Sequence, residues 1–215
     1  MKKYDVYVIN LDERTDRWDH IQKEFGEYEF LNLIRFPAIS HEIPWIGATL
    51  SHIKIAELAK EKNLDYVIVM EDDNAIFNKD EINFETKFLE TINFLKQQID
   101  KWKIFKFSCT YVNKDANKGA IKAINEDIGI YQLNVSQAAN FLIYNQTSYD
   151  AIIAHKNNIN SMEPDIIDIF LNTISPSWVL HPNITYQYAN HSDLLYCFMD
   201  YTQAFADVNN DLLQL

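Results

Sequence analysis

Three acidic residues in succession, Glu71, Asp72 and Asp73, follow an apolar run at positions 66–70. A run this short and this rich in β-branched residues predicts a strand buried on both faces of a parallel sheet. Three like charges side by side repel one another, so we expect a cation beside them. Glu71 and Asp73 are spaced by one residue, and both can turn toward one hard cation, such as Mg²⁺ or Mn²⁺.

The position of these acids fits a ligand site. In open α/β sheets, ligands bind beyond the carboxyl ends of the strands, where the acids lie. A metal ion that bridges a diphosphate would offset the clustered charge and stabilise a phosphate leaving group. The alternative is that acids in a loop after a strand are only solvated, which is the commoner outcome for so short a motif.

Two arginines, Arg14 and Arg17, follow the strand that we predict at residues 4–10. The first strand–helix turn of such a sheet commonly contacts a nucleotide. Asn10 at the strand end could contact its ribose or base, and the planar guanidinium group of arginine suits phosphate. The alternative is that both arginines pair with neighbouring acids on a solvated helix face.

Ser51 and His52 lie near the start of a helix that we predict at residues 47–63. The start of a helix presents free N–H groups that attract anions. His52 could contact a donor or orient an acid, although a single histidine on a helix is more often structural. His181 and His191 are later candidates for a third metal ligand.

Asp165 and Asp168 share one face of a helix predicted at residues 162–173. Transfer of a group to a hydroxyl requires a carboxylate that takes the hydroxyl proton. An acid at a helix N-terminus complements the helix dipole, which is a sufficient structural explanation for Asp165. Asp168 lies among apolar residues, so this explanation fits it less well.

Strands and helices alternate along the first half of the chain, which predicts an α/β fold with a Rossmann-like, mostly parallel sheet flanked by helices. The predicted strands are 4–10, 30–36, 66–70 and 103–108, and the helices between them are 13–25, 47–63 and 84–99. The second half is predicted to hold a loop or hairpin at 112–129, a strand at 140–145, helices at 146–158 and 162–173, and one or two strands at 177–188. We expect a single domain over residues 1–215, with a nucleotide-sugar half over about 1–110 and an acceptor half over about 111–215.

Composition excludes several classes of function. The net charge of −12 argues against non-specific binding to nucleic acid or to an anionic membrane. Cys109 and Cys197 lack metal-ligand spacing, so two buried reduced thiols are expected rather than a disulfide or a zinc site. No apolar run approaches the length of a transmembrane helix, and the first residues lack a signal-peptide cleavage site, which predicts a cytoplasmic protein.

Six segments resemble, in order, those of glycosyltransferase family 25, which contains bacterial lipooligosaccharide galactosyltransferases and the collagen-modifying galactosyltransferases. The segments are YVINLDERTDRW, GATLSHIKIAELA, VIVMEDDN, AANFLIY, EPDIIDIFL and HPNITYQYANHSDL, and they span most of residues 4–194. Each segment alone is weak, whereas their order and spacing together are fairly specific. The chain differs from the family pattern at Ala48, where the family has cysteine, and at Asn74, where it has a small apolar residue.

The resemblance implies a glycosyltransferase-A type fold, a nucleotide-sugar donor that is usually a UDP-hexose, and inversion at the anomeric carbon. It also implies that the acids form the metal and donor motif, and that Asp168 is a better candidate than Asp165 for the catalytic base. On this basis we expect donor contacts from Asn10, Arg14, Arg17, Ser51, His52, Glu71 and Asp72, and metal ligation by Asp73, Glu71 and His191.

The sequence therefore predicts a glycosyltransferase that depends on Mn²⁺ or Mg²⁺. It would move galactose or glucose from a UDP-sugar to a hydroxyl of a glycan or glycoconjugate, as in lipopolysaccharide biosynthesis. A first alternative is a catalytically inactive module of the same fold that binds a nucleotide sugar or a glycan. A second is a phosphate hydrolase built on the acid cluster, although the chain lacks a matching nucleophile motif.

Overall fold

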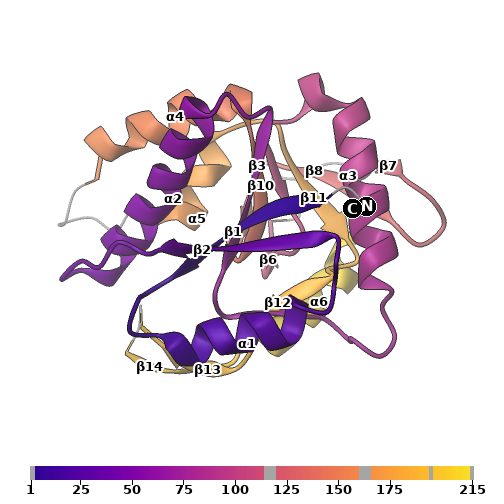
Figure 1. The fold of residues 1–215 in the computed structure, drawn as a ribbon. Coiled ribbons are helices and arrows are strands. Elements are labelled where there is room, and N and C mark those ends of the chain that lie inside the picture. Colours follow the sequence, from indigo (N-terminus) through magenta and orange to yellow (C-terminus); the bar gives the residue numbers. More distant parts are fainter. Residues whose placement is uncertain (1–2, 114–119, 160–165, 194–195, 214–215) are drawn as a thin grey trace.

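The structure is a computed structural model that describes residues 3–113, 120–159, 166–193 and 196–213. Eight strands form its central sheet: β1 (Tyr4–Asn10), β2 (Leu31–Pro37), β3 (Tyr66–Glu71), β5 (Ile104–Lys106), β7 (Ala120–Ala123), β8 (Gly129–Leu133), β10 (Phe141–Asn145) and β11 (Ser177–His181). Their order across the sheet is β2-β1-β3-β10-β5-β11-β8-β7 (Figure 1).

The sheet is mixed, with a parallel part at one edge. Strands β2, β1 and β3 are parallel neighbours, and so are β5 and β11. Strands β10 and β8 are antiparallel to their neighbours, so that β2, β1, β3, β5, β11 and β7 share one direction. Three short pairs lie outside the sheet: β4 (Asn74–Ile76) with β12 (Thr185–Gln187), β13 (Asn190–Ser192) with β14 (Cys197–Met199), and β6 (Tyr111–Val112) with β9 (Ser136–Gln137).

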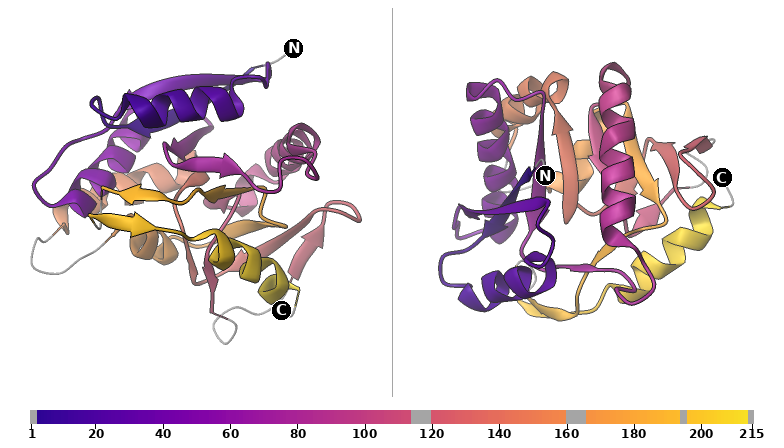
Figure 2. Two further views of the ribbon diagram at one scale, coloured as in Figure 1. Left: turned by 90° about the horizontal axis from the view of Figure 1, so that it is seen from below. Right: turned by 45° about the vertical axis from the view of Figure 1, so that its right-hand side comes forward.

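Helices cover both faces of the sheet. The α-helices are α1 (Thr15–Phe25), α2 (Pro44–Glu61), α3 (Phe84–Gln97), α4 (Tyr149–Ala154), α5 (Ile167–Phe170) and α6 (Thr202–Leu212), and short 3-10 turns lie at Ile99–Lys101, Gln146–Ser148, His155–Asn157 and Leu171–Thr173. Helices α1 and α3 pack on one face, whereas α2, α4 and α5 pack on the other (Figures 1 and 2). The predicted α/β fold with flanking helices is therefore confirmed.

The central strands are buried on both faces because successive side chains point to opposite sides of a sheet. In β3, Ile68 and Met70 belong to the core under α1 and α3. Val67 and Val69 belong to the core under α2, α4 and α5. These four side chains are at most 2% exposed. The predicted doubly buried strand before the acids is thus confirmed, and its end is held rigidly.

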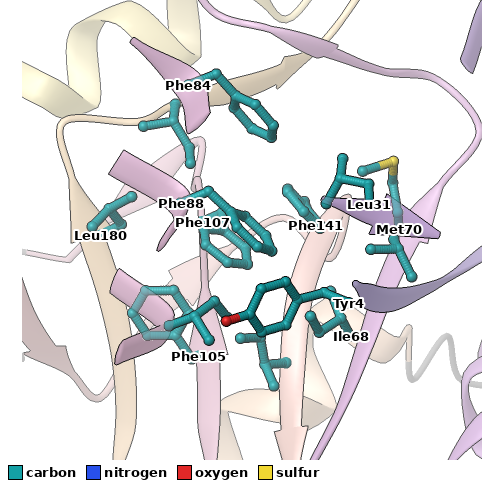
Figure 3. Close-up of a cluster of buried hydrophobic side chains, with 14 of the residues drawn as sticks. Tyr4, Leu31, Ile68, Met70, Phe84, Phe88, Phe105, Phe107, Phe141 and Leu180 are labelled. Carbon is teal, nitrogen blue, oxygen red and sulfur yellow. The ribbon is translucent and has the colours of Figure 1, made fainter. Parts of the chain in front are cut away.

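Aromatic rings fill the core under α3. The ring of Phe88 stacks on that of Phe107 with centroids 5.2 Å apart, and Phe107 stacks on Phe141 at 4.4 Å (Figure 3). Tyr4 and Phe30 also contact the ring of Phe88. Such rings bury large areas and gain further from their stacked and edge-on geometry. This cluster ties α3 to β5 and β10, next to the strand that carries the acids.

Several elements differ from the predicted ones. The helix expected to start at Gly47 begins at Pro44, a residue whose fixed φ angle suits the first turn of a helix. The region at 112–129, predicted to be a loop or hairpin, holds β7 and the turn to β8, and the pairing of these strands extends beyond it to Tyr131. The thiol of Cys109 is buried, but that of Cys197 is exposed, so the prediction of two buried thiols is wrong for Cys197. Both are free thiols, as expected.

No helix within the described residues combines the length and the apolar character that crossing a bilayer requires. Strands β11 and β12 both lie in the segment where one or two late strands were predicted, but the pairing of β12 with β4 was not predicted. The hairpin β13–β14 and the C-terminal helix α6 were not predicted either. Helix α6 buries Phe205, Val208 and Leu212.

We expect Phe88→Ala to lower the free energy of unfolding by about 3–5 kcal/mol, because it removes a fully buried ring and leaves a cavity among other aromatic rings. Chemical denaturation in urea measures this change. Phe198→Ala is the matched control, because Phe198 is 67% exposed and its truncation should change stability by less than about 0.5 kcal/mol. Equal effects of the two substitutions would contradict the packing described here.

Candidate functional site

A cavity of about 600 Å³ opens at the ends of the parallel strands β2, β1 and β3. Its wall includes Leu11 after β1, Ala38 after β2, and Glu71, Asp72 and Asp73 at and after the end of β3. Parallel neighbours end at the same edge of a sheet, and ligands of open α/β folds bind there. The structure thus gives the three acids the position that the sequence predicted, in the wall of a cavity.

The carboxyl groups of the acid cluster hold their protons unusually tightly. Burial raises the pKa of Glu71 to about 8, and repulsion from Asp168 and Asp72 adds to this effect. Burial likewise raises the pKa of Asp73 to about 7, reinforced by the charges of Glu71 and Asp72. Removal from water and nearby like charges both disfavour the ionised form of a carboxyl group. Full ionisation of the cluster would therefore place more negative charge there than its surroundings compensate.

Asp72 differs from its two neighbours because it has dedicated partners. Its Oδ1 accepts a hydrogen bond from Arg17 Nη1 at 2.9 Å, and the two side chains are 10% and 8% exposed. Its Oδ2 accepts a hydrogen bond from Asn10 Nδ2 at 2.6 Å. A buried ion pair keeps both charges only when its geometry is good and its remaining polar atoms are bonded. The ion pair between Arg17 and Asp72 thus connects α1 to the end of β3.

The same guanidinium group holds a distant part of the chain. Arg17 Nη2 donates to Asn190 Oδ1 at 2.6 Å and to the carbonyl oxygen of His191 at 2.8 Å. Asp193 forms ion pairs with Arg17, at 3.5 Å, and with Arg14. Helix α1 therefore fixes the hairpin β13–β14 beside the acids, as the neighbouring positions of these elements in Figure 1 illustrate.

Asn10 lies behind Asp72 and not on the cavity wall. It is 1% exposed, and its amide group donates a hydrogen bond to Asp72. Its amide also donates to the carbonyl oxygen of Arg14 at 2.9 Å, and its oxygen accepts from Arg35 Nε at 2.7 Å. The structure thus gives Asn10 a positioning role, and its expected contact with the donor stays a prediction.

Gln187 was given no role from the sequence, yet it joins Glu71 to Asp73. Its Nε2 lies 3.4 Å from Glu71 Oε2 and 3.4 Å from both carboxylate oxygens of Asp73. Strand β12 brings it there by pairing with β4, in a register that sets Gln187 opposite Asn74. The sequence feature that could have identified Gln187 as a site residue is its place in the last of the six segments that resemble family 25.

His52 is buried behind Glu71 and does not line the cavity. Its Nε2 lies 3.3 Å from Glu71 Oε1, and the hydroxyl group of Tyr144 lies 2.7 Å from its Nδ1. Burial lowers the pKa of His52 to about 4, so the ring is neutral at pH 7. Of the two roles considered for it, the geometry is that of a residue that orients an acid.

Ser51 lines the cavity and fixes the adjacent wall. Its hydroxyl group donates to the carbonyl oxygen of Gly47 at 2.7 Å and accepts from Ile39 N–H at 2.8 Å. A Cβ atom at Gly47 would lie 2.4 Å from the carbonyl oxygen of Ile39, so only glycine permits this close approach. Because α2 begins at Pro44, Ser51 lies beyond its first turn, and its N–H group is not one of the free ones expected there.

Asp168 lines the cavity from α5. Its Oδ1 is buried and has no hydrogen-bond partner in the described part of the chain. Burial raises the pKa of Asp168, whereas the charge of Lys106 and, when it is protonated, that of His52 oppose this rise. Lys106 is itself 1% exposed and donates to the carbonyl oxygen of Ser136 at 3.2 Å. A cavity-facing carboxyl group with a free oxygen and a raised pKa suits proton acceptance. Asp165 lies outside the described residues.

The expected third metal ligand is not beside the acids. The side chain of His191 is exposed and is absent from the cavity wall, and Nε2 of His181 bonds the carbonyl oxygen of Asn209 at 3.0 Å. No group of three or more His, Cys, Asp or Glu side chains suited to a metal ion occurs among the described residues. Two carboxylates still fit Mg²⁺ or Mn²⁺, which commonly complete their coordination with water and substrate phosphates.

No protein-family model matches the chain, and no curated protein sequence matches it. Similar solved structures include a protein from STIV, at 11% identity, covering 92% of this chain and 93% of that one with a TM-score of 0.45. They also include a glycosyltransferase involved in the glycosylation of the major capsid of PBCV-1 (9% identity, 80% and 73%, TM-score 0.42). A third is the mannose-1-phosphate geranyltransferase from Thermus thermophilus (7% identity, 83% and 73%, TM-score 0.43). Similarities at this level do not bear on the activity of this chain.

The raised pKa values of the acids predict how stability depends on pH without metal. Both groups bind protons more tightly in the folded than in the unfolded chain, so their contribution is greatest below about pH 4 and is lost as the pH rises through about 7 and 8. We therefore expect the melting temperature of the metal-free protein to fall between pH 6 and pH 9.

Thermal unfolding in EDTA across this range measures the effect. Glu71→Gln should flatten the slope because its neutral amide does not titrate, whereas the exposed Asp80→Asn should leave it unchanged. A slope that is the same in the wild-type chain and in Glu71→Gln would show that Glu71 does not have a raised pKa.

Proposed function

We propose that this chain is a metal-dependent, inverting glycosyltransferase that transfers a hexose from a UDP-sugar to a hydroxyl of a glycan or glycoconjugate. The observation that carries the proposal is the charge of the cavity. The lining carboxylates are Glu13, Glu71, Asp72, Asp73, Asp168 and Asp193. Arg17 is the only arginine or lysine in the wall that the described residues form, and Asp72 already occupies it.

A nucleotide diphosphate would meet strong repulsion in such a cavity unless a cation accompanied it. Within the acid cluster at the end of β3, Glu71 and Asp73 lack a charged cationic partner at hydrogen-bond distance, and Gln187 lies between them. They are the residues that would hold Mn²⁺ or Mg²⁺. The bound ion would neutralise the diphosphate and stabilise it as a leaving group.

Asp168 supplies the second chemical requirement, a base on the acceptor side. In an inverting transfer, the acceptor oxygen attacks the anomeric carbon from the face opposite the diphosphate. The bond from that carbon to the diphosphate oxygen breaks, and UDP leaves with the electron pair. The proton of the attacking hydroxyl passes to a carboxylate, for which the free Oδ1 of Asp168 is available.

The choice of donor rests on the resemblance of six segments to glycosyltransferase family 25, in which the donor is usually a UDP-hexose. Galactose and glucose are the sugars proposed. Arg14, on the first strand–helix turn, is the candidate for a further phosphate contact, once the diphosphate competes with Asp193 for its guanidinium group. A phosphate hydrolase is less well supported, because the chain lacks a matching nucleophile motif.

Binding of UDP should require both metal and Asp73. We expect isothermal titration calorimetry to give a clear UDP signal with Mn²⁺, little signal with EDTA, and a signal reduced by at least about tenfold in affinity for Asp73→Asn, which removes a charged ligand. Asp80→Asn, an exposed acid beyond β4, is the control and should bind as the wild type does.

The same titrations with GDP and CMP test the donor class. UDP should bind more tightly than either nucleotide. Stronger binding of GDP would contradict the assignment to UDP-sugars, and UDP binding that is unchanged in Asp73→Asn would contradict the metal site.

Loss of the base should slow transfer without weakening donor binding. We expect Asp168→Asn to lower turnover of UDP-galactose or UDP-glucose by ~10²–10⁴-fold, the range typical of general-base catalysis. Calorimetry with UDP and Mn²⁺ should give the wild-type affinity, because the group acts on the acceptor. Wild-type turnover in Asp168→Asn, with a loss in Asp165→Asn instead, would assign the base to Asp165.

A further inference from the structure

The turn of the hairpin β13–β14 presents a large aromatic side chain at the cavity. Tyr196 lines the cavity and is nevertheless 70% exposed. Phe198, two residues further along, is 67% exposed. Single apolar residues scattered over a surface need no explanation. Large aromatic side chains that are exposed together next to a pocket indicate a binding site.

The backbone of Tyr196 adopts a conformation that is uncommon for a bulky residue. Its φ angle is 55°, in the left-handed region. Its N–H group donates to the carbonyl oxygen of Ser192 at 2.9 Å, which closes the turn. Bulky residues persist in this region only where the surroundings fix them, and such positions concentrate at ligand sites. The backbone at Tyr196 is thus constrained where the side chain lines the cavity.

The hairpin itself is anchored to the acid cluster. Arg17 joins Asn190 and Asp193 of this hairpin to Asp72, as described above. Tyr196 lies just beyond this anchored part of the hairpin, and it lines the same cavity as Asp168 and the acid cluster. A ligand that lies on the ring would therefore occupy the cavity that also holds the proposed donor site and the proposed base.

We propose that Tyr196 is the stacking platform for a pyranose ring of the acceptor. This inference rests on the proposed glycosyltransferase function and specifies its acceptor side. A pyranose has one face of C–H groups that can cover an aromatic ring, while its hydroxyls stay in contact with water and with the polar wall. Exposed aromatic side chains can also bind a membrane. The net charge of −12 disfavours binding to an anionic membrane surface.

Saturation-transfer NMR with lactose and with methyl β-galactopyranoside tests the platform, because it reports which sugar protons approach the protein. Tyr196→Asn removes the ring but keeps a residue that tolerates the left-handed conformation. We expect it to weaken lactose binding by about 3- to 10-fold, the size of an aromatic stacking contribution. Tyr196→Phe should bind lactose as the wild type does, because stacking uses the ring and not the hydroxyl.

Tyr111→Ala is the matched control, since Tyr111 is 44% exposed but is not part of the cavity wall. It should leave the saturation signal unchanged. Equal lactose binding in the wild type, Tyr196→Asn and Tyr111→Ala would overturn the inference. So would the absence of any sugar signal with the wild-type chain, or co-sedimentation with phosphatidylglycerol vesicles that depends on Tyr196 and occurs without a sugar signal.

Calorimetry of UDP with Mn²⁺ on the same variants separates this inference from the proposed function. If UDP binds and the lactose affinity is the same in the wild type and in Tyr196→Asn, the stacking role of Tyr196 is contradicted and the proposed donor site is not. Lactose binding that needs Tyr196, in a chain that never binds UDP, would support the platform and overturn the proposed function. A loss of UDP affinity in Tyr196→Asn would make the ring a nucleobase contact, which also contradicts the acceptor role.

Discussion

Three carboxyl groups at the end of β3 share one buried guanidinium group, that of Arg17. The guanidinium group pairs with Asp72, which leaves Glu71 and Asp73 half-buried, without a charged cationic partner at hydrogen-bond distance and with raised pKa values. Its second nitrogen holds Asn190, so the same group also positions the hairpin β13–β14. The acid-lined end and the outer wall of the cavity therefore both depend on one residue of α1.

Much of the fold could be predicted from local patterns. The apolar run before Glu71 is too short for a helix and too apolar for a surface strand, so it had to be a buried strand, as it is. The position of the acids follows from that strand direction. The pairing of β12 and the hairpin β13–β14 were harder to predict from the sequence. Their strands are only three residues long, and β12 pairs with a strand far away in sequence. Gln187 reaches the acids through the pairing of β12 with β4, which no local pattern encodes.

The roles of individual site residues depended on side-chain partners that the sequence does not specify. Asp168 was expected to lie deep because apolar residues flank it; the residue is half-buried, and its Oδ1 atom is buried. His52 was expected near a helix start, but the helix begins earlier, at Pro44, and the ring orients Glu71 from behind. The position of Asn10 at a strand end is compatible with a ligand contact and with a positioning role. Its hydrogen bonds to Asp72 and Arg35, which the sequence does not specify, favour the positioning role.

The most direct test of the central claim is the melting temperature of the protein with and without UDP, each in EDTA and in Mn²⁺. If Glu71 and Asp73 hold the cation that holds the diphosphate, UDP and metal must strengthen each other's binding. UDP at about 100 times its dissociation constant should then stabilise the protein by ~2.7 kcal/mol in Mn²⁺, which raises the melting temperature by ~5–10 °C, and should have no effect in EDTA. An equal rise in EDTA and in Mn²⁺ would contradict the account.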